Sequence, residues 1–171
     1  MAPPSYDPQY LLVGVIGRPH GLRGEVTLRT HNERGANLIG VPALILERGD
    51  AREERKVVAA RHTNDDWLMR MEGVDSRDAA AALTHAAVWV RRNTLPPLGP
   101  GEFFVEDVRG CTIRNEKGQV LGIAESVFWN GAQDVMVVSG DVEYLIPLVP
   151  AVVRVVDAPR REVTVEWQQD E

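Results

Sequence analysis

The sequence predicts an all-β protein made of two small β-barrel domains, with one short helix near residues 76–84. Three observations support this fold class. Short runs with strand character recur roughly every 10 to 15 residues, an uncharged segment rich in proline and glycine interrupts them near the middle, and only one alanine-rich segment lacks the strand pattern. We place the domains at residues 10–92 and 101–168, with a linker at residues 93–100.

The first half contains six predicted strands. They are separated by glycine, proline, asparagine and aspartate, the residues that favour turns. This spacing is typical of a small antiparallel barrel or sandwich. The runs are Leu11–Gly17, Gly24–Thr30, Ala43–Glu47, Glu54–Arg61, Asp66–Met71 and Ala87–Arg91.

The segment Ser76–Leu83, reading SRDAAAAL, breaks this pattern. It has no β-branched residue, and either Asp75 or Ser76 can accept backbone N–H bonds at its start. A short helix is therefore expected here. The linker follows in Asn93–Gly101, reading NTLPPLGPG, where proline removes ladder donors and glycine permits turns.

The strand pattern resumes after the linker and predicts a second small barrel. The tetrapeptide Asn115–Gly118 has the composition of a hairpin turn, with Gly118 available for a positive φ. The six predicted strands are Val108–Ile113, Val120–Phe128, Asp134–Ser139, Glu143–Ile146, Val152–Val156 and Glu162–Trp167.

The net charge of −6 on 171 residues is unevenly distributed. Up to Leu98 the chain has 13 basic and 12 acidic residues, whereas from Gly99 onward it has 6 basic and 13 acidic residues. This asymmetry suggests two domains with differently charged partners.

No apolar run reaches the roughly 18 residues of a membrane span, and the single cysteine, Cys111, cannot form an internal disulfide. We therefore expect a cytoplasmic protein with no membrane association.

No catalytic or metal-binding motif is found. The histidines His20, His31, His62 and His85 have neither HxH nor HxxxH spacing and no neighbouring cysteine pair. GxSxG, GxGxxG and P-loop patterns are also missing from the sequence. We expect a protein that is not an enzyme and that carries no cofactor and no metal.

Two segments are candidates for binding. In Gly14–Gly24, four glycines surround Arg18, His20 and Arg23, and such a loop can hold an RNA phosphate through guanidinium and backbone N–H groups. A tight turn that serves only the fold explains this segment equally well.

The second segment, Gly101–Gly110, contains Phe103 and Phe104 beside acidic residues. In a strand, one ring would enter the core while the other faces outward, toward an apolar and basic partner or the neighbouring domain. Burial of both rings is equally consistent with the sequence.

These two motifs resemble those of the RimM family of ribosome maturation factors. Val13–Val26, reading VGVIGRPHGLRGEV, is similar to the family's opening motif, and Gly101–Ile113, reading GEFFVEDVRGCTI, is similar to the start of its PRC-barrel domain. Three shorter matches follow in the family's order. They are Gly118–Gly122, Gln133–Val137 and Leu145–Val149.

The resemblance implies a translation-factor-like N-terminal barrel followed by a PRC barrel. It also implies a non-enzymatic, monomeric factor that binds the head of the small ribosomal subunit and small-subunit ribosomal protein nineteen, and assists late maturation and rRNA processing. By this resemblance, Phe103, Phe104 and Val105 bind the ribosomal protein. We assign rRNA contacts to Arg18, His20 and Arg23.

The sequence departs from the family pattern in two places. Phe103 and Phe104 replace the usual tyrosines and Val105 the usual tryptophan, which removes two phenol hydroxyls. Thr84-His85 replaces a basic residue followed by glycine after the predicted helix.

An alternative function is a flavin-binding reductase, because small six-stranded barrels also occur in that class of enzyme. No convergent cluster of polar residues in the sequence supports this alternative.

Overall fold

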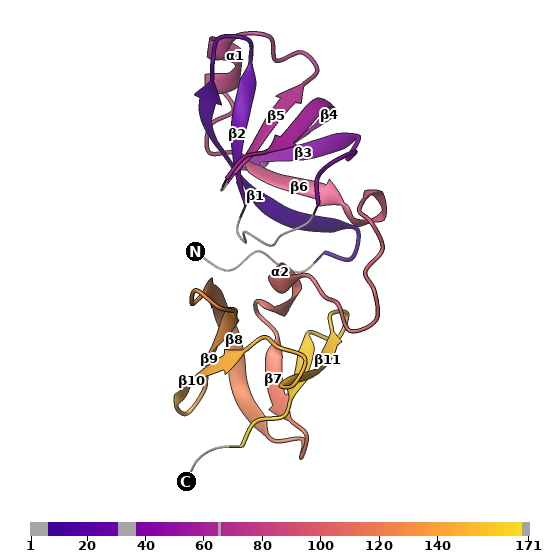
Figure 1. The fold of residues 1–171 in the computed structure, drawn as a ribbon, viewed down its shortest axis with the longest axis vertical. Coiled ribbons are helices and arrows are strands. Elements are labelled where there is room, and N and C mark those ends of the chain that lie inside the picture. The colour runs from indigo at the N-terminus through magenta and orange to yellow at the C-terminus, as the bar shows by residue number, and fades with distance from the viewer. Residues whose placement is uncertain (1–6, 31–36, 65, 169–171) are drawn as a thin grey trace. The chain divides into compact units, whose positions relative to one another are not determined.

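The computed structural model describes residues 7–30, 37–64 and 66–168, which form two compact units. One unit spans Asp7–Pro97 and the other begins at Leu98, so the division falls inside the predicted linker. Figure 1 shows the strands of each unit, and each unit is described separately below.

The first unit is a closed six-stranded barrel in which every neighbouring pair of strands is antiparallel. The strand order around the barrel is β1-β2-β5-β4-β3-β6, and β6 returns to β1. The all-β prediction is therefore confirmed. The strands are β1 (Tyr10–His20), β2 (Glu25–Thr30), β3 (Ala43–Arg48), β4 (Ala51–His62), β5 (Trp67–Met71) and β6 (Ala87–Arg91).

Strand β1 closes the barrel because it pairs with β2 on one side and β6 on the other. Its register shifts between Leu12 and Gly14 toward β6, and between Ile16 and Pro19 toward β2. Such irregularities bend a strand, and a small barrel needs that curvature. The side chains that fill the barrel are fully or almost fully buried. They include Leu11, Val13, Ile16, Val26, Leu28, Leu44, Leu46, Met69, Met71, Val88 and Val90.

The predicted helix is confirmed as α1 (Arg77–Ala81). Ser76, rather than Asp75, caps it, because the Ser76 hydroxyl accepts the Ala79 backbone N–H at 3.1 Å. After the helix, His85 adopts a φ of +74° where the family pattern has glycine, and its backbone N–H donates to the Ile16 carbonyl of β1 at 2.9 Å. Histidine is one of the residues that tolerate this left-handed region.

The predicted linker begins with ordered structure of the first unit. A single 3₁₀ turn, η1 (Arg92–Thr94), follows β6, and Leu95 is buried. The Arg92 guanidinium Nε donates to the carbonyls of Asp7 and Tyr10, each at 2.9 Å. These bonds fasten the end of β6 to the segment that leads into β1.

The second unit contains a six-stranded sheet in the order β10-β9-β8-β7-β12-β11. All of its pairs are antiparallel except β12 with β7, which is parallel. Its core includes Val108, Ile113, Met136, Ile146 and Val163, each fully buried. The elements are α2 (Val105–Val108), β7 (Thr112–Asn115), β8 (Val120–Trp129), β9 (Asp134–Ser139), β10 (Glu143–Pro147), β11 (Val153–Asp157) and β12 (Glu162–Val165).

One predicted strand of this unit is partly wrong. The run Val108–Ile113 was expected to be extended, but a helical turn, α2, ends at Val108 and β7 begins only at Thr112. Acidic residues favour the first turn of a helix, and Glu106 and Asp107 occupy it here.

The predicted turn between β7 and β8 is confirmed. Gly118 has a φ of +82°, and its N–H donates to the Asn115 carbonyl at 3.0 Å. The Asn115 side-chain oxygen accepts the backbone N–H groups of Lys117 and Gln119, also at 3.0 Å each. Asn115 is thus buried, and both its backbone and its side-chain oxygen accept hydrogen bonds.

Candidate functional site

The glycine-rich segment is only partly a loop: β1 continues to His20, three residues past the predicted strand end, and Gly21–Gly24 form the turn to β2 at one end of the barrel. Gly24 has a φ of +96°, and a Cβ at this position would lie 2.1 Å from the Val74 carbonyl oxygen. Any other residue would therefore be strained and would clash with the backbone before α1. Here the glycine has a structural role, as the fold-only interpretation of this segment expected.

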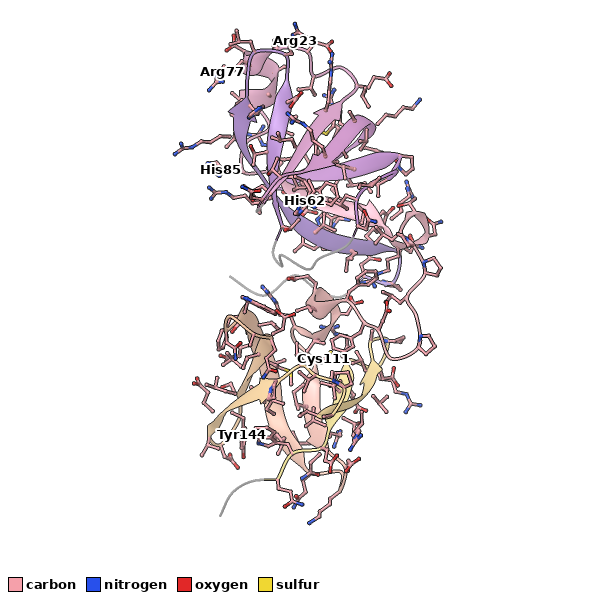
Figure 2. All side chains as sticks on the ribbon, viewed as in Figure 1. Arg23, His62, Arg77, His85, Cys111 and Tyr144 are labelled. Atoms are coloured by element: carbon pink, nitrogen blue, oxygen red, sulfur yellow. The ribbon has the colours of Figure 1, made fainter. Side chains whose placement is uncertain are left out.

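The three predicted RNA-binding side chains are all exposed at this end of the barrel. Arg18 and His20 are two residues apart on β1, so they project from the same face of the strand. Arg23 lies in the turn itself, at the tip of the first unit in Figure 2. Among the described residues, neither the Arg18 nor the Arg23 side chain makes a hydrogen bond or an ion pair, so their guanidinium donors are available to an anion.

A third arginine at this tip was not predicted from the sequence. Arg77, the first residue of α1, lies beside Arg23 in Figure 2, and its guanidinium donates to the Gly21 carbonyl at 3.0 Å. The sequence separates Arg77 from the turn by more than 50 positions, and only the packing of α1 brings it there. Arg61 of β4 pairs at 3.2 Å with Glu25, the first residue of β2 after the turn. The tip thus carries several arginines, and the Glu25 carboxylate offsets part of their positive charge.

The two phenylalanines lie before α2 and not in a strand, so the alternation expected for them does not apply. Both are half-buried, as is Val105. Phe103 packs against the core of the second unit, whereas Phe104 is not among the apolar side chains that pack there. Phe104 precedes the first residue of α2, and its carbonyl accepts the Asp107 N–H at 2.9 Å. The structure thus gives the two adjacent rings different surroundings.

Arg161 holds this segment in place from the hairpin between β11 and β12. Its guanidinium donates to the Asp107 carbonyl at 3.0 Å and to the Arg109 carbonyl. These carbonyls lie at the end of α2, where a helix leaves acceptors without partners in the helix itself. Arg161 therefore fixes the helical turn that follows Phe104.

Cys111 lies directly behind this turn and is fully buried. Its thiol donates to the Asp107 carbonyl at 3.1 Å. Burial raises the pKa of the Cys111 thiol, and Asp107 raises it further, while Arg161 acts in the opposite direction. A buried thiol with a raised pKa is a poor nucleophile, so Cys111 supports the fold.

Over the described ranges, no three histidine, cysteine, aspartate or glutamate side chains gather as a metal site would require. No helix within the same ranges is long and apolar enough to cross a membrane. Each unit instead has a candidate binding surface. The first unit has an arginine-bearing tip, and the acidic second unit has an aromatic segment.

Two family models match the chain in succession. The model for the RimM N-terminal domain matches residues 11–95, and the model for the RimM PRC barrel domain matches residues 105–170. The chain belongs to the RimM family. The proposed resemblance is therefore confirmed, and the second unit's sheet corresponds to the family's PRC barrel.

Individual RimM proteins match over nearly the whole chain. The ribosome maturation factor RimM of Methylococcus capsulatus is 37% identical over 164 residues, which covers 95% of both chains. The protein of the same description from Sorangium cellulosum is 37% identical over 158 residues, covering 91% of this chain and 93% of its own. A crystal structure of a 16S ribosomal RNA processing protein RimM from Pseudomonas aeruginosa covers 93% of this chain at 25% identity, with a TM-score of 0.47.

Proposed function

We propose that this chain is a ribosome maturation factor that binds the small ribosomal subunit and assists late maturation and rRNA processing. The observation that carries the proposal is the match of both RimM domains, in order, across one chain. Relatives that cover 91% or more of this chain are described as ribosome maturation factors, and one solved relative as a 16S ribosomal RNA processing protein.

We assign rRNA contacts to the tip of the first unit. Arg18 and Arg23 present guanidinium donors without partners among the described residues, and Arg77 adds a further guanidinium beside Arg23. Arginine forks match phosphate oxygens, so this cluster suits an RNA backbone. His20 shares the exposed face of Arg18 and adds ring nitrogens that can hydrogen-bond to RNA.

We assign the contact with small-subunit ribosomal protein nineteen to the second unit, at Phe103, Phe104 and Val105. Six basic residues against 13 acidic residues from Gly99 onward give this part of the chain a strongly negative balance. Negative charge attracts a basic protein and repels RNA. The half-buried rings supply contact area, and the missing phenol groups make this contact depend on ring area rather than on hydrogen bonds.

The proposed role is non-enzymatic, cytoplasmic and monomeric. It requires neither a cofactor nor a membrane, because the surfaces described above bind by charge and apolar area alone. An absorbance spectrum of the purified chain tests the alternative of a flavin enzyme. A flavin band in the visible region that persists through dialysis would support the alternative.

Co-sedimentation with small ribosomal subunits tests the proposed function. The full chain is mixed with immature or with mature subunits, centrifuged, and measured in the pellet. We expect it to sediment with immature subunits and much less with mature ones. Equal recovery with both, or recovery with neither, would contradict a role in late maturation.

A further inference from the structure

The second unit has an apolar outer face that neither the arginine tip nor the phenylalanine segment uses. We define the β8–β9–β10 outer face by six residues on three neighbouring strands, visible side by side in Figure 1. They are Ile123, Phe128, Val135, Val137, Leu145 and Pro147.

The strand register puts these side chains on one face. Phe128 pairs with Val135, which pairs with Pro147, and Val137 pairs with Leu145. Cross-strand partners share a face of the sheet. The residues between them in sequence, Met136 and Ile146, are fully buried and belong to the core. The six residues defined above therefore lie on the side away from that core.

Three of the six residues of this face are exposed, Val137 and Pro147 are half-buried, and Val135 is buried. Ile123 and Leu145 are each 52% exposed and Phe128 is 43% exposed. Of the large apolar side chains that are exposed in the described ranges, those in the second unit outnumber those in the first. The second unit contributes Leu98, Val120, Ile123, Phe128, Trp129, Val142, Leu145 and Val155, and the first Leu22, Ile39 and Val58. An exposed apolar patch on a sheet face is a candidate interaction site.

The charges around the face are of one sign. Between Lys117 and Arg154 the chain has no basic residue, but it has four acidic ones. Glu125, Asp141 and Glu143 are exposed, and their carboxylates make no ion pair among the described residues. Glu143 pairs with Ser139, which pairs with Ile123, so a carboxylate and an exposed apolar side chain share one cross-strand row.

We propose that the β8–β9–β10 outer face binds a polypeptide segment in which lysine or arginine side chains alternate with apolar ones. Apolar side chains of the partner would cover Ile123, Phe128 and Leu145, and its cations would meet Glu125, Asp141 and Glu143. Charge complementarity selects such a partner over RNA, whose phosphates the carboxylates repel. This surface is distinct from Phe103–Val105, and the inference goes beyond the ribosomal contact proposed there.

Fluorescence anisotropy with labelled peptides tests this inference on the full chain. A peptide of alternating lysine and leucine is compared with two control peptides, one of alternating glutamate and leucine and one of alternating lysine and serine. We expect the lysine–leucine peptide to bind at least about tenfold more tightly than either control. Equal binding of the glutamate–leucine peptide would overturn the role of the carboxylates.

The double variant Ile123→Lys/Leu145→Lys should weaken binding of the lysine–leucine peptide by about tenfold or more. The matched control is Val58→Lys, which places a lysine at a 61% exposed strand residue of the first unit and should leave binding unchanged. A loss of affinity in the control as well would show that binding is nonspecific and would overturn the proposal.

Three further readouts keep the test decisive. If the lysine variant loses its thermal transition, Ile123→Ser/Leu145→Thr replaces it, and unchanged binding by this folded variant contradicts the proposal. Self-association of the wild type in sedimentation equilibrium, or binding of single-stranded RNA, contradicts it if either is lost in the double variant. The peptide-binding assay contains no ribosome. A negative result in the co-sedimentation test of the proposed function would therefore leave this inference standing.

Discussion

We propose that Arg18 and Arg23 bind rRNA, whereas the neighbouring Gly24 serves the fold. Gly24 fixes the shape of the turn, while the two guanidinium groups project into solvent without partners in the described part of the chain. The fold would lose little if either were shortened, because exposed arginines without ion pairs contribute little to stability. Their effect should therefore appear in binding rather than in folding.

We expect Arg18→Ala/Arg23→Ala to weaken association with immature small subunits and to flatten its salt dependence. Each phosphate contact releases counterions, so removing two contacts lowers the slope of log K against log [salt] by roughly 1.4 to 1.8. Binding measured from 50 to 200 mM salt checks this. Arg52→Ala, an exposed arginine of β4 paired with Glu47, serves as the control. If mutant and wild type have the same slope, these arginines do not contact phosphate.

The buried thiol of Cys111 makes stability depend on pH. Its pKa is raised in the folded state, chiefly by burial, so the folded state holds the proton more tightly than the unfolded chain does. This contribution is fully present below the unfolded pKa of about 8.5 and is lost as the pH rises through the higher folded pKa. We expect the free energy of unfolding to fall above about pH 8.5, less steeply in Cys111→Ala than in the wild type.

Urea unfolding of both proteins at pH 7 and at pH 9.5 measures this difference. Because Cys111→Ala also removes buried volume, its stability at pH 7 is the reference for its own pH series. Parallel pH dependences in the two proteins would show that other groups are responsible.

At the scale of elements, α2 is where the sequence was least informative. Strand runs before the linker were predicted well because alternating apolar residues and turn residues mark them locally. The segment Phe103–Gly110 carries no such period, and its helical turn depends on Arg161, which arrives from the hairpin between β11 and β12. A contact across more than 50 residues has no local signature. Arg77 at the arginine tip escaped prediction for the same reason.

His85 departs from the family pattern, but a tertiary hydrogen bond supports it. The family pattern has glycine at this position, yet α1 ends at Ala81 and His85 takes the left-handed conformation itself. The bond from its N–H to the Ile16 carbonyl holds the residue there. Tertiary hydrogen bonding therefore offsets a local cost of roughly 1–2 kcal/mol.

The different surroundings of the two rings before α2 separate their roles. Phe103→Ala should lower the free energy of unfolding of the second unit by about 1–3 kcal/mol, because that ring packs against the core. Phe104→Ala should cost less stability and weaken binding to small-subunit ribosomal protein nineteen. Urea unfolding and calorimetric titration of both variants measure the two effects. Unchanged affinity in Phe104→Ala would remove this ring from the proposed interface.

At the scale of the whole molecule, the charge of −6 describes neither unit. The division at Pro97 and Leu98 separates a nearly neutral part with an arginine tip from an acidic part with an apolar face. Each unit has its own core and its own strand ladders. This division fits the proposed function, in which the first unit binds RNA and the acidic second unit binds a basic protein.

We expect residues 7–97 and residues 98–168, produced as separate fragments, each to unfold cooperatively. Domains of this size bury roughly 60% of their surface, which is enough for marginal independent stability. Circular dichroism during heating checks this, with the full chain as reference. A fragment without a cooperative transition would show that its unit depends on the rest of the chain.

The parallel ladder between β12 and β7 joins the first and last strands of the second sheet, so this sheet can be completed only after its last strand has been synthesised. Every ladder of the barrel joins residues between Tyr10 and Arg91, so that unit is complete in sequence before any strand of the second has been made. The second sheet is different, because β12 lies between β7 and β11 and ends at Val165. Strand β7 can pair with β8 as soon as both are made, but the ladder with β12 must wait for the last strand, so the barrel can fold while the second unit is still being synthesised.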